Sequence, residues 1–169
     1  VAMGCLLVLQ TAHAFVSAPA LSQVQRSRIL PLSMTSTKVC NKTDLAVGTR
    51  KMVKIDDEDV LVLNHNNMVY ALSPKCPHHG LPMKTGEISD AGPCITCKFH
   101  GSQFDLNTGK AVKWCESVLG IPGTKFLGNM VSKVGGAAHS PARVFAVEVA
   151  PDGGVWVDTA RPGRSGAAL

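Results

Sequence analysis

Between residues 44 and 158, apolar side chains mostly alternate with polar ones or form short runs bounded by turn residues. Alternation with a period of two is typical of strands and not of helices. The connecting segments hold Asn, Asp, Gly and Pro, which suit tight turns. The pattern predicts an all-β domain, an antiparallel sandwich or barrel, with strands near residues 52–55, 60–63, 68–72, 102–106, 110–114, 143–149 and 155–157.

Two stretches interrupt this pattern. Residues 74–101 combine Gly, Pro, Cys and His in the manner of loops, and residues 116–142 form a long segment rich in Gly. Long connections without secondary structure of their own are uncommon in compact domains. We therefore interpret residues 116–142 as a functional insertion or as a partly helical segment.

The first forty residues are typical of targeting sequence. Residues 1–43 contain no acidic residue, and a short apolar core precedes Ala12-His13-Ala14, an arrangement that signal peptidases cut. The following segment is basic and rich in Ser, Thr and Pro, and it begins with Phe15 directly after the cleavage motif. This order resembles the bipartite presequence of algae with complex plastids. We expect a signal peptide over 1–14, a transit peptide over 15–40 and delivery to a plastid, with a secretory signal as the alternative.

The positive charge of the chain lies outside the predicted domain. There are 17 Lys and Arg against 12 Asp and Glu, a formal net charge of +5. Residues 1–40 and 161–169 supply this excess, whereas residues 41–160 hold equal numbers of basic and acidic residues. Charge therefore gives no support for a nucleic-acid partner. No segment approaches the ~20 apolar residues that span a bilayer, so we expect no membrane insertion of the mature protein. The Gly- and Ala-rich residues 161–169 are predicted to be a disordered tail, and the folded domain is predicted at 41–160.

Four residues form two short pairs that suit a metal centre. Cys76 and His78 are two positions apart, and Cys97 and His100 are three apart. Thiolate and imidazole ligands suit either zinc or an iron–sulfur centre. A zinc finger normally pairs Cys with Cys and His with His, whereas here each loop supplies one of each. This mixed order fits a centre in which one iron binds both thiolates and the other binds both imidazoles. A structural zinc site is the alternative.

The two boxes, Cys76-Pro77-His78-His79-Gly80 and Cys97-Lys98-Phe99-His100-Gly101, resemble those of the Rieske 2Fe-2S proteins. The resemblance continues beyond each box and covers residues 47–158. It implies a Rieske-like antiparallel fold with a small cluster-binding subdomain of two loops, residues 74–84 and 94–104. The implied cofactor is a 2Fe-2S cluster.

The resemblance also implies a role for each matching residue. Cys76 and Cys97 are expected to bind the inner, ferric iron, and His78 and His100 the outer, reducible iron. The residues expected next to the cluster are Pro82, Ser102 and Phe104. The nearby His79 has the wrong spacing for a ligand and is expected to be a partly exposed loop residue. Trp114 and Trp156 are expected in the core, and no catalytic residue is predicted.

Departures from the family pattern refine the subtype. Rieske subunits of cytochrome bc and b6f complexes carry a disulfide between the cluster loops, and Leu81 and Phe99 occupy the matching positions. Those subunits also place a Ser and a Tyr near the cluster sulfurs. Ser102 matches the Ser, but Phe104 stands where the Tyr would be. Because hydrogen bonds to sulfur stabilise the more negative reduced state, loss of one donor predicts a low reduction potential.

These features predict a ferredoxin-like carrier that transfers one electron at a time to or from a redox protein partner, a reductase or an oxygenase. The predicted domain leaves no room for the mononuclear iron site of a terminal oxygenase. Two alternatives remain. The chain could be a small Rieske subunit of a reductase or oxygenase complex, similar to the nitrite reductase small subunit, or a non-redox assembly module of a photosynthetic complex that uses residues 116–142 as its contact.

Overall fold

Two apolar runs joined by a tight turn form the centre of the larger sheet. In the computed structural model, which describes residues 35–89, 91–117, 121, 124, 139–162 and 165–169, they become β3 (Glu58–His65) and β4 (Met68–Leu72). Asn66 and Asn67 make the turn with φ angles of 52° and 59°. Asn tolerates this left-handed conformation better than most residues do, which explains why the chain reverses here.

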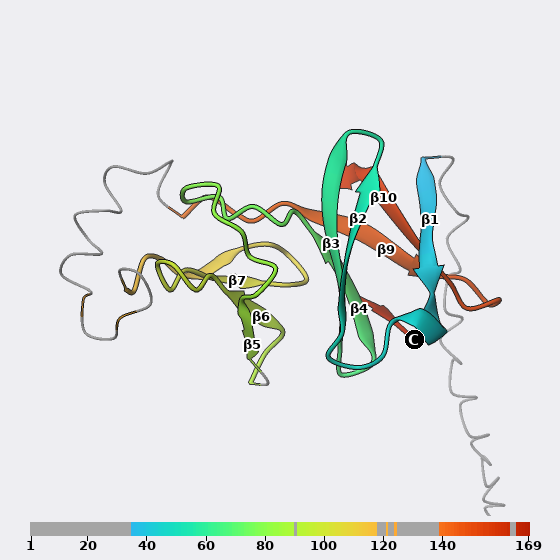
Figure 1. Ribbon diagram of the computed structural model, residues 1–169, viewed down its shortest axis with the longest axis horizontal. Coiled ribbons are helices and arrows are strands. Elements are labelled where there is room, and N and C mark those ends of the chain that lie inside the picture. Colours follow the sequence, from blue (N-terminus) through green and yellow to red (C-terminus); the bar gives the residue numbers. More distant parts are fainter. Residues whose placement is uncertain (1–34, 90, 118–120, 122–123, 125–138, 163–164) are drawn as a thin grey trace, which may run out of the picture. The chain divides into compact units, whose positions relative to one another are not determined.

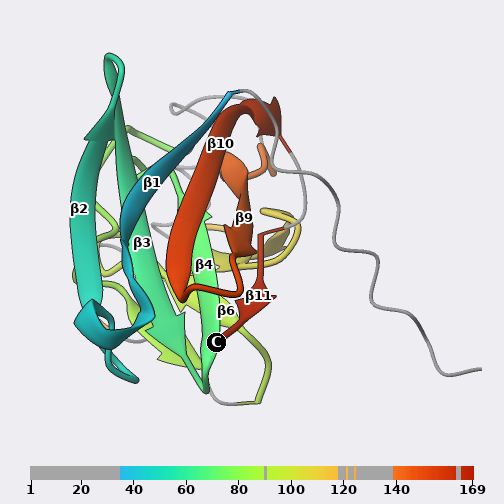
Figure 2. The same cartoon turned by 90° about the vertical axis from the view of Figure 1, so that its right-hand side faces the viewer.

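The larger sheet is antiparallel throughout (Figure 1). Its path is β1-β10-β9-β4-β3-β2, and β11 pairs with β4, as Figure 2 shows. The remaining strands of this sheet are β1 (Ser36–Asn41), β2 (Arg50–Ile55), β9 (Val144–Val149), β10 (Gly154–Pro162) and β11 (Ala167–Ala168). A single 3-10 turn over Lys42–Asp44 is the one helical element among the described residues.

A smaller four-stranded sheet follows β4 in the chain. Its strands, paired in sequence order, are β5 (Glu87–Ser89), β6 (Cys94–Thr96), β7 (Gln103–Asp105) and β8 (Ala111–Lys113). The predicted all-β antiparallel fold class is therefore confirmed. Across the described ranges, no helix has the length and apolar character needed to cross a membrane.

Both faces of β3 and β4 are buried, each in a different core. Val60 and Val62 belong to a core within the larger sheet, together with Phe145 and Val157. The alternate residues of β3 face a second core that extends to the smaller sheet. The members of this second core include Leu61, Leu63, Tyr70, Leu72, Met83, Ile95, Phe104 and Leu106. Each fully buried side chain of this size contributes roughly 1.5–3 kcal/mol of hydrophobic free energy, so this core fixes the smaller sheet against the larger one.

The fold begins earlier than predicted. Residues 36–40, assigned to the transit peptide by the sequence pattern, belong to β1, which pairs with β10 from Ser36↔Asp158 to Asn41↔Gly154. Cys40 is buried in the core of the larger sheet. The strand was missed because four of its six residues are polar and three are exposed, as suits the edge of a sheet. The predicted signal peptide and most of the predicted transit peptide lie outside the described residues.

The prediction of a disordered tail over 161–169 is wrong for its last residues. The Ser165 hydroxyl oxygen accepts a hydrogen bond of 2.6 Å from the buried Ala71 N–H, and the Ser165 N–H donates to Asn107 O at 3.0 Å. β11 then pairs with β4. Small residues allow this approach, since a Cβ on Gly166 would lie 2.9 Å from Asn107 Oδ1. Most of the predicted insertion, residues 116–142, lies outside the described residues.

Replacing Ser165 with Ala is expected to lower the free energy of unfolding by about 1–3 kcal/mol, because the buried Ala71 N–H loses its acceptor. The control is Thr49→Ala, which removes an exposed hydroxyl bonded to Ala46 O and is expected to cost less than about 0.5 kcal/mol. Denaturant unfolding of both variants measures the difference. Equal stabilities would contradict the docking of residues 165–169 onto β4.

Candidate metal centre

The first box lies on a tight loop that follows β4. The Cys76 N–H donates to Leu81 O at 2.8 Å, and the Gly80 N–H donates back to Cys76 O at 2.7 Å. Gly80 has a φ of +68°, a conformation that glycine adopts without strain. The loop closes at its base where the Met83 N–H donates to Pro74 O. Cys76 and His78 are thereby held on one short turn.

The second box repeats this arrangement in the β6–β7 hairpin. The Cys97 N–H donates to Ser102 O at 2.8 Å, and the Gly101 N–H donates to Cys97 O at 2.9 Å. Gly101 also has a positive φ, +66°. The segment predicted as a loop over 94–104 is therefore two short strands with a tight turn between them. In both boxes a glycine four residues after the cysteine returns a hydrogen bond to the cysteine carbonyl.

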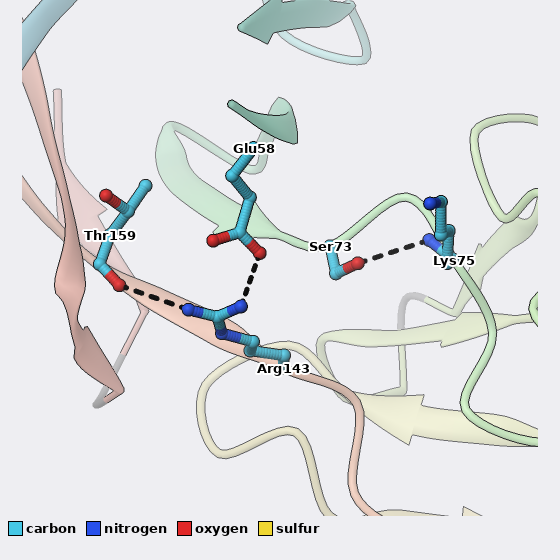
Figure 3. A network of polar contacts seen from close by, with 5 residues as sticks. All are labelled: Glu58, Ser73, Lys75, Arg143 and Thr159. Carbon is cyan, nitrogen blue, oxygen red and sulfur yellow. Dashed lines mark hydrogen bonds and ion pairs between the residues drawn. The ribbon is translucent and has the colours of Figure 1, made fainter. Parts of the chain in front are cut away.

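Arg143 anchors the base of the first loop to the larger sheet (Figure 3). Its carbonyl accepts from the Ser73 N–H at 2.8 Å, so the chain leaving β4 is bonded to the chain entering β9. The guanidinium contacts the Glu58 carboxylate at 2.6 Å and Thr159 O at 3.5 Å. Because the Arg143 side chain is 55% exposed, this ion pair contributes modestly to stability.

A cleft of about 530 Å³ opens beside this anchor. It is lined by the acidic run Asp56–Asp59 together with Ser73, Lys75 and Arg143. None of the four predicted ligands lines it. The cleft therefore belongs to the junction between the first loop and the larger sheet, and the metal centre lies elsewhere.

The two cysteines of the boxes meet as a buried sulfur pair. Their thiols are hydrogen-bonded to each other, which lowers the pKa of Cys97 to about 6 and raises that of Cys76. Backbone N–H groups of His78 and His79 also bond Cys76 Sγ, and those of Phe99 and His100 bond Cys97 Sγ. Such N–H groups favour the thiolate, which is the form that binds metals.

The two histidines of the boxes form a nitrogen pair. His78 Nδ1 and His100 Nδ1 lie 3.2 Å apart, and the ring centroids are 4.8 Å apart. His78 is buried, whereas His100 is partly exposed. Burial lowers the pKa of His100, and the neighbouring His79 adds to this effect. A neutral imidazole is the form that binds a metal ion.

The structure thus groups the predicted ligands as two like pairs, two sulfurs and two nitrogens. Among the residues described, no three or more His, Cys, Asp or Glu side chains surround a single point as one metal ion would require. Two pairs, each with two donors of the same kind, match a binuclear centre whose irons differ in their ligands. The donor set and the N–H groups bonded to sulfur fit a 2Fe-2S cluster.

The three residues predicted next to this centre differ in burial and in their contacts. Ser102 is fully buried, and its hydroxyl oxygen accepts from the Cys115 N–H at 3.0 Å, which leaves the hydroxyl hydrogen available to a second partner. Phe104 is fully buried on β7. Pro82 is exposed and forms an isolated bridge with Lys75 at the base of the first loop.

Sequence reasoning missed one neighbour of the centre. The sequence places Trp114 in the core, and its partly buried side chain does pack against the second core. Its ring centroid also lies 5.2 Å from that of His78. No spacing rule pointed to it, since it comes from the end of β8 and not from a box. His79 is exposed, and its ring lies 4.1 Å from that of His78. Among the described residues, the thiol of Cys94 is free.

Comparison with known protein families decides the identity of this fold and centre. The family described as "Rieske [2Fe-2S] domain" matches residues 35–120, which include both boxes and begin just before β1. The chain belongs to the Rieske family. The cofactor of this family is a 2Fe-2S cluster, in agreement with the two pairs of ligands described above.

Individual relatives of this Rieske chain cover about half of it. Apoptosis-inducing factor 3 of Mus musculus is 33% identical over 79 residues, 47% of this chain, but these residues span 13% of that protein's length. The ferredoxin component of biphenyl 2,3-dioxygenase from Rhodococcus jostii is 31% identical over 78 residues, which cover 46% of this chain and 71% of the relative.

A solved structure extends the similarity to most of the fold. The ferredoxin of carbazole 1,9a-dioxygenase from Nocardioides aromaticivorans superposes with a TM-score of 0.53 at 23% identity. The match covers 73% of this chain and 96% of that ferredoxin. It shows a shared fold.

Proposed function

We propose that this protein carries single electrons on a Rieske 2Fe-2S cluster bound by Cys76, Cys97, His78 and His100. The observation that supports this most directly is the grouping of these residues into a buried sulfur pair and a nitrogen pair. The cluster supplies a site that takes up and releases one electron. The chain itself supplies the ligands, the N–H groups that stabilise the thiolates and the two glycine turns that hold both boxes rigid.

The position of the histidines sets the side on which electrons are exchanged. The cysteines are buried, whereas His100 is partly exposed and His79 beside it is exposed. A redox partner therefore approaches the histidine side, where protein thickness between the centre and the partner is smallest. Because the biphenyl 2,3-dioxygenase relative is a ferredoxin component, we infer that the partner is a reductase or an oxygenase.

We also propose delivery to a plastid. The support is the sequence alone: residues 1–43 lack acidic residues, and Phe15 follows the cleavage motif directly. Both predicted segments begin ahead of β1, which starts at Ser36.

The ligand assignment predicts a Rieske-type EPR signal after dithionite reduction of the iron-loaded protein. Cys97→Ser is expected to abolish this signal, because it removes one of the two thiolates. Cys94→Ser, a matched cysteine on β6 three residues earlier, is expected to retain it. A wild-type protein that binds zinc and gives no such signal would refute the proposed function.

The lack of a hydroxyl at Phe104 predicts a potential toward the low end of the Rieske span of roughly −150 to +300 mV. Phe104→Tyr is expected to raise the potential and Ser102→Ala to lower it, each by about 60–120 mV if one hydrogen bond to a charged acceptor is gained or lost. Redox titration of the three proteins gives the order. A wild-type value near the top of the span would contradict this prediction.

The targeting proposal predicts that residues 1–35, fused to a fluorescent protein behind an initiator methionine, direct it into the plastid of an alga with complex plastids. A fusion with residues 1–14 alone is expected to enter the secretory pathway. Fluorescence microscopy locates both fusions. Secretion of the longer fusion would favour a plain secretory signal.

A further inference from the structure

The indole of Trp114 lies beside a proposed ligand with its N–H group buried. The residue directly follows β8, and its ring is 5.2 Å from the His78 ring in an edge-on arrangement with an interplanar angle of 67°. The ring also meets the Phe104 ring edge-on, at 6.3 Å. Trp114 Nε1 is buried, and within the described part of the protein it has no hydrogen-bond acceptor.

A buried N–H without an acceptor is costly. Leaving such a donor unsatisfied is unfavourable, and buried Trp N–H groups usually find a partner. The rings near the indole, those of His78, Phe104 and His139, offer no oxygen to accept it. The acceptors that the family cofactor brings to this place are sulfur atoms, which accept hydrogen bonds and carry more negative charge after reduction.

We infer that the Trp114 N–H donates a hydrogen bond to a sulfur of the 2Fe-2S centre and raises its reduction potential. The inference rests on the proposed function. Trp114 would thus supply a hydrogen-bond donor that Phe104, which lacks a hydroxyl group, does not supply. The exposed His139 ring lies 5.6 Å from the Trp114 ring. Trp114 thus acts on the centre through its N–H group.

Trp156 provides a matched comparison. Its Nε1 is also buried without an acceptor in the described residues, but it lies on β10 in the larger sheet. None of its described ring contacts involves a ligand histidine. An unsatisfied indole therefore does not by itself indicate a role at the centre; the contact of Trp114 with His78 does.

The test is a redox titration of Trp114→Phe and Trp156→Phe, both of which keep an aromatic ring and lose the indole N–H. Trp114→Phe is expected to shift the reduction equilibrium about tenfold toward the oxidised form, a fall in potential of about 59 mV for one electron. Trp156→Phe is expected to leave the potential unchanged. An unchanged or raised potential in Trp114→Phe would overturn the inference.

A second measurement keeps Trp114 in place, so it does not depend on whether Trp114→Phe binds the cluster. The chain has two tryptophans, so Trp156→Phe grown with indole labelled by ¹⁵N carries the label at Trp114 alone. Pulsed EPR of this reduced protein is expected to show coupling of the ¹⁵N nucleus to the unpaired electron. A Rieske signal without this coupling overturns the role of Trp114 and leaves the proposed function standing. Absence of any Rieske signal contradicts the proposed function itself.

Discussion

Hydrogen bonds from backbone N–H groups to two cysteine sulfurs determine how the other parts of the fold must be arranged. Each sulfur accepts N–H groups from the residues two and three positions later, which requires a tight turn directly after each cysteine. Both turns close through a glycine with positive φ, Gly80 in one box and Gly101 in the other. Two such turns can face each other only if the segments that bear them are held rigidly. The smaller sheet holds the second of them in its β6–β7 hairpin.

The larger sheet provides that rigidity through the two-sided burial of β3 and β4. Alternate residues of one strand enter separate cores, so the same backbone supports the larger sheet and the loop-bearing sheet. A shift of one residue in the register of β3 would exchange the side chains of the two cores. Placement of the cluster loops thus depends on strand register, with the Arg143 contacts as a smaller local contribution.

Local pattern predicted much of this arrangement. Alternation located most strands of the larger sheet, and the spacing of Cys76, His78, Cys97 and His100 identified residues that the fold brings together. β1 and residues 165–169 were missed because neither a polar edge strand nor a Gly- and Ala-rich segment shows in its own sequence which strand it will pair with. For β1 that partner is distant: Ser36 pairs with Asp158, over a hundred residues later. Trp114 was assigned to the core for the same reason: its contact with His78 is a property of the packed fold.

The contacts made by Ser165 have a consequence for the order of events during synthesis. β1 emerges early but pairs with β10, and Ser165 bonds β4 to the segment after β7. The larger sheet therefore cannot be completed until residues near 165 have left the ribosome. Long-range pairing of this kind slows folding. β1 therefore stays unpaired through most of the synthesis of the chain, and its polar, partly exposed residues suit a strand that waits in water for its partner.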